Sequence, residues 1–281
     1  MKSTDIKMLH IESSSKCNAW CPACPRNNQG FGLADHMVET DLDVDRLLQI
    51  LDQLPNLEVV QLCGNYGDPI AGSNIMSIVD LCVGKNLKVQ IHTNGGLRNT
   101  SWWADLGKKL APHAHDVWFG IDGVGDTHEI YRQGTDYNKV IENASSFIDA
   151  GGYATWQFIP YQHNQSQIME AMKISQQLKF KKFKLATLFR KNKIMAKHWK
   201  TGEPFELKVA EKIVPLLRID HKKSAPEPTN CMHLSIPSVY VDAQGKISWC
   251  CYRASESAQS VQEVLDRVLD LNNIQCITQC S

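Results

Sequence analysis

The chain has 281 residues, of which 30 are basic and 30 are acidic, so its formal net charge is zero. This length suffices for one large α/β domain with a small appendage. Balanced charge without long runs of one sign argues against binding to nucleic acid or an anionic membrane surface. The sequence has neither an apolar signal core nor an apolar run of membrane-spanning length. Its ten cysteines therefore indicate metal or redox chemistry in a cytoplasmic protein.

Short strand-like runs alternate with amphipathic helical runs from residue 7 to about residue 190. The expected strands are Lys7–Glu12, Leu57–Leu62, Leu87–His92, Asp116–Ile121, Ala154–Pro160 and Lys182–Leu188. The expected helices are Val44–Leu54, Asn74–Val83, Trp102–Leu110, Lys139–Ala150 and Gln167–Leu178. This alternation predicts βαβ units and a parallel sheet. Six such units are too few for a closed eight-stranded barrel, and an open doubly wound sheet would give the same pattern.

The alternation stops after residue 190. We expect a Lys-rich connection, a helix near Glu206–Leu217 and a polar link at Ser224–Pro228. Beyond these, Val239–Cys250 reads as a β-hairpin that turns at Gln244-Gly245, and Val261–Leu271 as a helix. The expected organisation is a barrel-like domain over 1–190, a connecting segment over 191–228 and a small domain over 229–281.

Three cysteines lie close together directly after the first expected strand. Cys17, Cys21 and Cys24 form a C-x3-C-x2-C array. Cysteine thiolates hold iron–sulfur clusters, so the array could bind three irons of a [4Fe–4S] cluster and leave the fourth iron open. The alternative is a zinc knuckle on Cys21 and Cys24, for which His36, twelve residues past Cys24, is the nearest further ligand.

This array after a first strand resembles that of the radical S-adenosylmethionine (SAM) superfamily. The resemblance implies an α/β fold of the partial (β/α)6 TIM-barrel type. It also implies a [4Fe–4S] cluster whose open iron binds SAM, and reductive cleavage of SAM to a 5′-deoxyadenosyl radical that abstracts a substrate hydrogen. An electron donor of the flavodoxin or ferredoxin type would supply the electron.

Stretches at the expected strand ends, where α/β proteins place their sites, add to the resemblance. Gly67-Asp68-Pro69 resembles the superfamily's G-E-P stretch for the SAM amino group, and Thr93-Asn94-Gly95 resembles its T-N-G stretch. Gly120-Ile121-Asp122-Gly123 resembles S-x-D-G. Read singly, each of these stretches could be an ordinary turn. The resemblance assigns SAM binding to Gly67, Asp68, Asn94, Asp122, Arg132 and Ile159.

The sequence departs from the superfamily's pattern at several positions. Tyr66 replaces the usual first glycine, Asp68 the usual glutamate and Gly120 the usual serine. Ala23 stands where an aromatic residue often contacts adenine. We therefore expect other groups, including Trp20 or Tyr161, to hold the adenine.

A second group of cysteines lies in the C-terminal tail. The spacing Cys231-x13-Gly245-x4-Cys250 resembles the opening of the SPASM and twitch extensions. Cys276 and Cys280 would complete a fully ligated auxiliary [4Fe–4S] cluster of the twitch type. A structural zinc on four cysteines is the alternative. Cys251 would be a spare thiol, and Cys63 and Cys82 small buried apolar residues.

A fully ligated auxiliary cluster cannot bind substrate, so its simplest role is electron transfer. The resemblance therefore favours a two-electron oxidation of a small molecule or of a peptide that binds without a leader-binding domain. A peptide-crosslinking maturase, a redox-neutral isomerase, a glycyl-radical activase and a non-enzymatic Fe–S or zinc carrier are the alternatives. Candidate substrate-side residues follow the fifth and sixth strands: Tyr161, His163, Arg190 and Lys191.

Overall fold

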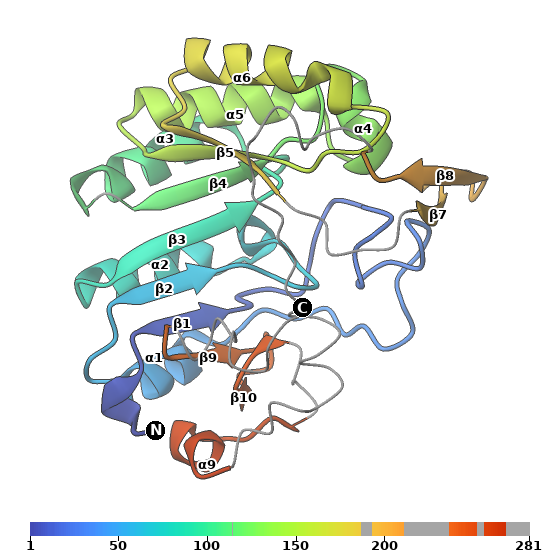
Figure 1. Cartoon of the computed structure of the whole chain (residues 1–281). Helices are drawn as coiled ribbons and strands as arrows, with labels where there is room; N and C mark the ends of the chain where they lie inside the picture. The colour runs from blue at the N-terminus through green and yellow to red at the C-terminus, as the bar shows by residue number, and fades with distance from the viewer. Residues whose placement is uncertain (114, 187–192, 211–235, 252–255, 268–281) are drawn as a thin grey trace, which may run out of the picture.

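The computed structural model describes residues 1–113, 115–186, 193–210, 236–251 and 256–267. Eight strands form one sheet in the order β10-β9-β1-β2-β3-β4-β5-β6 (Figure 1). The strands that follow the predicted alternation are β1 (Met8–Ile11), β2 (Val59–Leu62), β3 (Lys88–Thr93), β4 (Asp116–Gly120), β5 (Ala154–Phe158) and β6 (Lys182–Leu185). All six pair in parallel in chain order, and no described pairing joins β6 back to β1. The sheet is therefore the predicted partial barrel of a parallel α/β protein.

The predicted helices lie between these strands. They are α1 (Val44–Leu51), α2 (Ile75–Gly84), α3 (Thr100–Leu110), α5 (Tyr137–Asp149) and α6 (Ile168–Gln177). Helix α1 begins where predicted because the Asp43 side chain accepts a hydrogen bond from the Arg46 amide and caps the first turn. The short helix α4 (Thr127–Tyr131) was not predicted. Among the described residues, no helix is both long enough and apolar enough to cross a bilayer.

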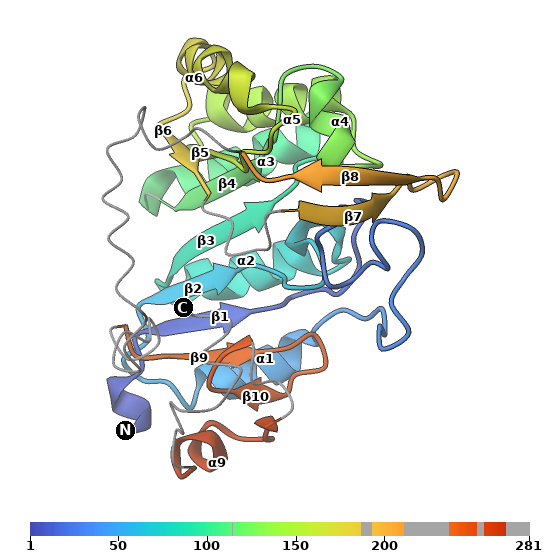
Figure 2. The same cartoon turned by 45° about the vertical axis from the view of Figure 1, so that its right-hand side comes forward.

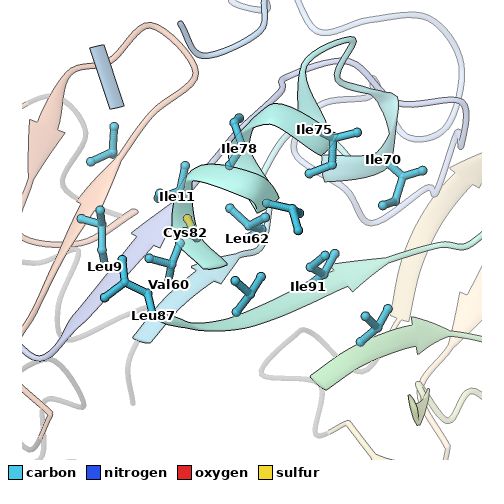
Figure 3. Packing of buried hydrophobic residues seen from close by; sticks show 14 of the residues in the cluster. Leu9, Ile11, Val60, Leu62, Ile70, Ile75, Ile78, Cys82, Leu87 and Ile91 are labelled. Carbon is cyan, nitrogen blue, oxygen red and sulfur yellow. The ribbon is translucent and has the colours of Figure 1, made fainter. Parts of the chain in front are cut away.

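The hydrophobic core lies between the helices and one face of the sheet. Figure 3 shows Ile75, Ile78 and Cys82 of α2 packed near Val60, Leu62 and Ile91 of the sheet. The Cys82 side chain is fully buried in this core, as predicted. Because side chains alternate along a strand, the intervening residues lie on the opposite face. That face carries polar and aromatic residues, and several are half-exposed: Gln61, Gln90, His92, Trp118 and Gln157.

A hairpin that the sequence did not predict lies at the carboxyl ends of the strands. Strands β7 (Lys193–Lys197) and β8 (Pro204–Lys208) pair antiparallel, and Figure 2 shows them beside the loop that follows β1. The expected helix near Glu206–Leu217 is therefore wrong for Glu206–Lys208. Buried Leu207 alternates with exposed neighbours there, which is the period of a strand. Residues 211–217 lie outside the described part of the chain.

The C-terminal segment extends the same sheet. Strand β9 (Ser238–Val241) pairs in parallel with β1, and β10 (Ile247–Ser248) pairs antiparallel with β9 through the predicted hairpin. Gly245 adopts a φ of 76° at the turn, a conformation that favours glycine. Helix α9 (Val261–Leu265) follows. The segment packs on the barrel, because Arg46 of α1 donates to the Gly245 carbonyl at 3.0 and 2.9 Å.

Candidate functional site

The three cysteines of the N-terminal array lie in the loop after β1, at the carboxyl ends of the strands. Each thiol contacts a residue of a different loop at this end of the sheet. Asn94, after β3, donates to the Cys17 sulfur at 3.6 Å, and Arg132, after α4, reaches the Cys21 sulfur at 4.0 Å. The Cys24 thiol lies 3.8 Å from the Asn65 carbonyl oxygen, after β2. The fold therefore places the array beside Asn94 of one predicted stretch, beside Asn65 just before another, and beside Arg132, the ion-pair partner of Asp122 in the third.

Burial raises the pKa of two of these thiols, Cys17 and Cys21. It raises the pKa of Cys21 to about 12, and it raises the pKa of Cys17 well above its usual value of 9.0. The neighbouring thiols Cys21 and Cys24 raise the pKa of Cys17 further, so the three groups lie within electrostatic reach of one another. Iron binds the thiolate, so metal loading would release these protons and relieve the repulsion.

Three cysteine thiols are the donor set of a cubane iron–sulfur cluster, in which each thiolate binds a different iron. In the described part of the chain, no three His, Cys, Asp or Glu side chains are close enough to bind one metal ion. His36, the candidate fourth zinc ligand, instead makes an edge contact with the Tyr66 ring at 5.7 Å.

Two buried residues that the sequence analysis did not single out anchor the cysteine loop. Arg26 is 2% exposed; its guanidinium donates to the Ser15 carbonyl at 3.2 Å and forms an ion pair with Glu39. Asn27 donates to the Cys21 carbonyl at 3.2 Å. Arg26 and Asn27 follow the array in the sequence, but they belong to no motif that would have indicated their role.

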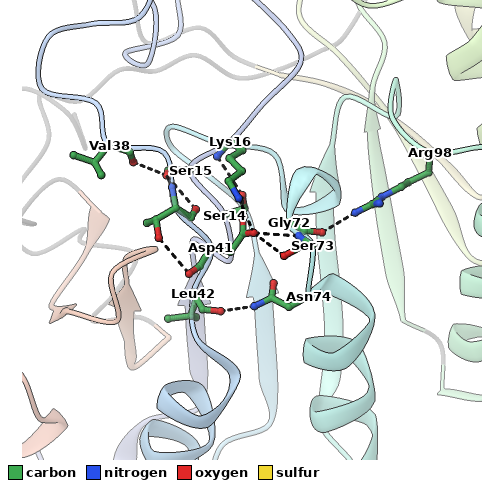
Figure 4. Close-up of polar contacts among 11 residues, drawn as sticks. Ser14, Ser15, Lys16, Val38, Asp41, Leu42, Gly72, Ser73, Asn74 and Arg98 are labelled. Carbon is green, nitrogen blue, oxygen red and sulfur yellow. Dashed lines mark hydrogen bonds and ion pairs between the residues drawn. The ribbon is translucent and has the colours of Figure 1, made fainter.

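A second anchor joins this loop to the start of α2 (Figure 4). Asp41 accepts hydrogen bonds from the Ser14 hydroxyl at 2.7 Å and the Lys16 ammonium at 2.9 Å. It also accepts from the Ser73 amide and hydroxyl, at 3.2 and 2.9 Å. Asp41 therefore fixes the residues just before Cys17.

Asp68, in the Gly67-Asp68-Pro69 stretch, is buried, and its carboxylate accepts hydrogen bonds from other groups of the protein. It accepts from the Thr93 hydroxyl at 2.8 and 3.0 Å, from the Asn94 amide at 2.7 Å and from the Ile70 amide at 2.9 Å. These contacts lock the end of β2 to the end of β3. The backbone amides of Gly67 and Asp68 are also used, by the Glu12 carboxylate at 2.8 Å and by the Lys16 carbonyl at 2.8 Å.

Asn94 lies between the array and the end of β3. Its side-chain amide donates to Asn18 at 3.0 Å as well as to the Cys17 sulfur, and its oxygen accepts from the Gly96 amide at 2.8 Å. Asn94 is buried. Its orientation is therefore fixed before a ligand arrives.

Fully buried Asp122 and half-buried Arg132 form an ion pair at the end of β4. The Arg132 Nε donates to Asp122 at 2.6 Å, while the other carboxylate oxygen of Asp122 accepts from the Ile159 amide at 2.5 Å. Three of the predicted SAM contacts thus form one connected unit. The Asn164 side chain, which the sequence analysis missed, extends the unit by donating to the carbonyls of Asp122 and Ile159 at 2.9 and 3.0 Å.

This ion pair explains one departure from the superfamily's pattern. A Cβ atom at Gly120 would lie 2.4 Å from the Arg132 Nη2 atom. The usual serine therefore cannot be placed at position 120 while the guanidinium occupies its observed position. The absence of a side chain at Gly120 leaves room for the Arg132 guanidinium.

Two of the four predicted substrate-side residues, Tyr161 and His163, lie in the described part of the chain. Tyr161 is fully buried; its ring contacts Tyr131 at 4.8 Å and stacks on His163 at 5.6 Å. Burial lowers the pKa of His163 to about 4. Tyr161 belongs to a hydrophobic cluster that includes Cys21 and Leu207 of the β7–β8 hairpin. Arg190 and Lys191 lie outside the described residues.

Another group of side chains on the inner face of the sheet was not expected from the sequence. The His92 ring stacks on Trp118 at 4.5 Å, and the Lys184 ammonium lies 4.0 Å from the centre of the same indole. Gln61 contacts the His92 ring at 3.3 Å. Burial is the largest factor that lowers the pKa of His92, to about 3, so its imidazole is neutral at pH 7.

One cysteine of the proposed auxiliary set lies in the described part of the chain. Cys250 lies two residues after β10 and is 5% exposed. Cys231, Cys276 and Cys280 lie outside the described residues, so the ligand set of the tail stays a prediction. The neighbouring Cys251 lies within electrostatic reach of Cys63 at the end of β2, where it contributes to the raised pKa of that thiol after the larger effect of burial.

The partial parallel barrel has the fold of radical SAM enzymes. SuiB of Streptococcus suis bound to S-adenosylmethionine matches with a TM-score of 0.64 and 15% identity, over 89% of this chain and 61% of that one. The enzyme anSMEcpe with bound AdoMet matches with a TM-score of 0.51 and 20% identity, over 66% of this chain and 52% of that one. SuiB bound to its precursor peptide SuiA gives a TM-score of 0.51 and 19% identity, over 65% and 39% of the two chains.

This chain spans less than two thirds of the length of these structures. At such identities the match establishes the fold alone. No family model and no curated protein matches the sequence.

Proposed function

We propose that this protein is a radical SAM enzyme. The observation that carries the proposal is the set of contacts around Cys17, Cys21 and Cys24: Asn94 after β3, Asn65 after β2, and Arg132, which forms an ion pair with Asp122 after β4. A non-enzymatic metal carrier would need the thiols but not the fixed polar groups around them.

In this proposal the cysteine array holds a [4Fe–4S] cluster and the strand ends hold SAM. Together the bound cluster and SAM supply a 5′-deoxyadenosyl radical that abstracts a hydrogen from the substrate. The chain's own residues orient and shield the ligand. Asn94 fixes one side of the array, and Arg132 offers a cation for the SAM carboxylate.

The remaining assignments follow from the same unit. The Asp122–Arg132 pair holds the Ile159 backbone in place, so that Ile159 presents an apolar surface for the adenine. The loop at Gly67 contributes a backbone carbonyl beside the array, because the Asp68 carboxylate and the Gly67 amide are already used within the protein. Tyr161 packs behind Cys21 and shields it from solvent.

We propose a peptide as the substrate class. SuiB bound to its precursor peptide SuiA and anSMEcpe bound to a Cp18Cys peptide support it, because both share this fold. His92, Trp118 and Lys184 supply polar and aromatic contacts on the inner face of the sheet. A small-molecule substrate is the alternative.

We propose a two-electron oxidation as the reaction. Its support is the tail, where Cys250 lies on a hairpin that pairs directly with the barrel through β9 and β1. An auxiliary cluster on Cys231, Cys250, Cys276 and Cys280 would accept the electron that remains on the substrate after hydrogen abstraction. An electron donor of the flavodoxin or ferredoxin type would reduce the first cluster.

Metal content tests both cluster assignments. Anaerobically reconstituted protein should bind about eight irons per chain, and the variant with Cys17, Cys21 and Cys24 replaced by Ala should retain about four. Addition of SAM should change the electron paramagnetic resonance spectrum of the reduced wild type but not that of the triple variant. Four irons and one zinc in the wild type would overturn the auxiliary cluster alone. A wild-type spectrum that SAM leaves unchanged would overturn the SAM site.

A further inference from the structure

Glu12 is a buried carboxylate directly after β1 that the proposed function does not use. Its side chain is 1% exposed. Oε1 accepts hydrogen bonds from the amides of Tyr66 and Gly67 at 2.7 and 2.8 Å. Oε2 accepts from the Tyr240 hydroxyl at 2.6 Å. One carboxylate thus joins the loop after β2 to the C-terminal segment.

Burial of a carboxylate is costly unless hydrogen bonds replace its water. Among the described residues, no Lys, Arg or His forms an ion pair with Glu12. The two loop amides and the Tyr240 hydroxyl are therefore the groups that compensate for the lost hydration. Removal of the hydroxyl leaves one carboxylate oxygen without its donor inside the protein.

The loop held by Glu12 is the one predicted to bind SAM. The Tyr66 and Gly67 amides point at Glu12, and Gly67 packs so closely that an added Cβ would lie 1.9 Å from the Ser14 carbonyl oxygen. On the opposite side of the loop, the Asn65 carbonyl oxygen faces the Cys24 thiol at 3.8 Å. Glu12 thereby commits the amides to β1 and leaves a carbonyl, an acceptor suited to an ammonium group, beside the cysteine array.

Tyr240 reaches Glu12 because of the sheet register. Strand β9 pairs in parallel with β1, with Tyr240 opposite His10. The two rings make an edge contact at 5.0 Å, and Tyr240 is 1% exposed. This register holds the Tyr240 hydroxyl beside Glu12, which lies two residues after His10 in the sequence.

We infer that Tyr240 is a positioning residue for SAM: through Glu12 it holds the loop at residues 65–67 in the conformation that binds the SAM amino group. The inference rests on the proposed function. It assigns the C-terminal hairpin a role in the SAM site that does not depend on an auxiliary cluster.

The test uses the anaerobically reconstituted full chain and SAM as the probe. Tyr240→Phe removes only the hydroxyl, and Tyr153→Phe is the matched control, because Tyr153 lies before β5 and its ring contacts Lys182. Calorimetric titration should show SAM binding weakened about tenfold in Tyr240→Phe, the scale of one hydrogen bond to a charged group. Iron content should stay at the wild-type value, and Tyr153→Phe should bind SAM as the wild type does.

Two further measurements separate positioning from a general loss of stability. In a Glu12→Gln background, Tyr240→Phe should weaken SAM binding by a smaller factor than in the wild type, because its effect passes through the carboxylate. Hydrogen exchange in Tyr240→Phe should accelerate at the Tyr66 and Gly67 amides.

SAM affinity of Tyr240→Phe within twofold of the wild type would overturn the inference and leave the proposed function standing. The inference would also be overturned if Tyr240→Phe weakened SAM binding by the same factor in the wild type and in Glu12→Gln. Unchanged hydrogen exchange at the Tyr66 and Gly67 amides of Tyr240→Phe would overturn it as well. Failure of the wild type itself to bind SAM would overturn the proposed function and the inference with it.

Discussion

Several polar side chains at the strand ends have their hydrogen bonds satisfied within the protein before any ligand binds. Asp68 accepts from two amides and a hydroxyl, and Asp122 accepts from an amide and a guanidinium. Such groups cannot reorient without breaking several contacts. The arrangement suits a site that holds a ligand at fixed geometry rather than one that forms around it.

Gly120 gives the sharpest prediction at the level of a residue. Gly120→Ala should lower the free energy of unfolding by about 1–3 kcal/mol, because its Cβ would overlap a guanidinium that Asp122 holds in place. Urea unfolding measures the change. Gly84→Ala is the control, because a Cβ there meets nothing within 4 Å. Equal stability of the two variants would contradict the proposed placement of Arg132.

Motif spacing identified these residues, but it could not identify their partners. The motifs assign Asp122 and Arg132 to SAM as separate residues. Their ion pair depends on the fold, because α4 brings Arg132 back to the end of β4. The Glu12–Tyr240 bond joins residues 228 positions apart. No local pattern encodes it, because it depends on β9 pairing with β1.

At the scale of elements, periodicity predicted the barrel's strands and helices to within a few residues. Alternating and 3.6-residue patterns are local, and burial on the barrel's outer layer reinforces them. The β7–β8 hairpin was missed because it is short and mostly exposed, with Ala196 and Leu207 as its buried residues. Tertiary contact with the cysteine loop, rather than sequence pattern, explains its position.

Asp41 links two elements and gives a pH prediction. Burial would raise its pKa, but hydrogen bonds from Lys16, Ser14 and Ser73 outweigh burial and lower the pKa from 3.8 to about 2. A carboxyl group whose pKa is lower in the folded state stabilises that state above the unfolded pKa. The stabilisation is lost as the pH falls from about 4 towards 2.

Asp41→Asn should therefore reduce the free energy of unfolding by about 1 kcal/mol at pH 7. The difference from the wild type should stay constant down to about pH 5 and narrow below pH 4. Urea unfolding at a series of pH values measures it. The exposed, ion-paired Asp105 provides the control variant Asp105→Asn, which should differ little from the wild type. A difference that widens on acidification would contradict the assigned contacts of Asp41.

At the scale of the whole molecule, the sheet unites segments from both ends of the chain. The C-terminal hairpin pairs with β1, which leads directly into the cysteine array. The sequence predicted both segments separately, but their pairing is a non-local contact that sequence patterns do not specify.

The central claim is that the array at Cys17, Cys21 and Cys24 makes this protein cleave SAM. The most direct measurement is the formation of 5′-deoxyadenosine from SAM by the anaerobically reconstituted, chemically reduced protein, compared with the variant in which all three cysteines are alanine. We expect the wild type to form 5′-deoxyadenosine and the variant to form none while retaining the iron of its tail. Equal formation by the two proteins, or none by a wild type that carries its full iron content, would contradict the account.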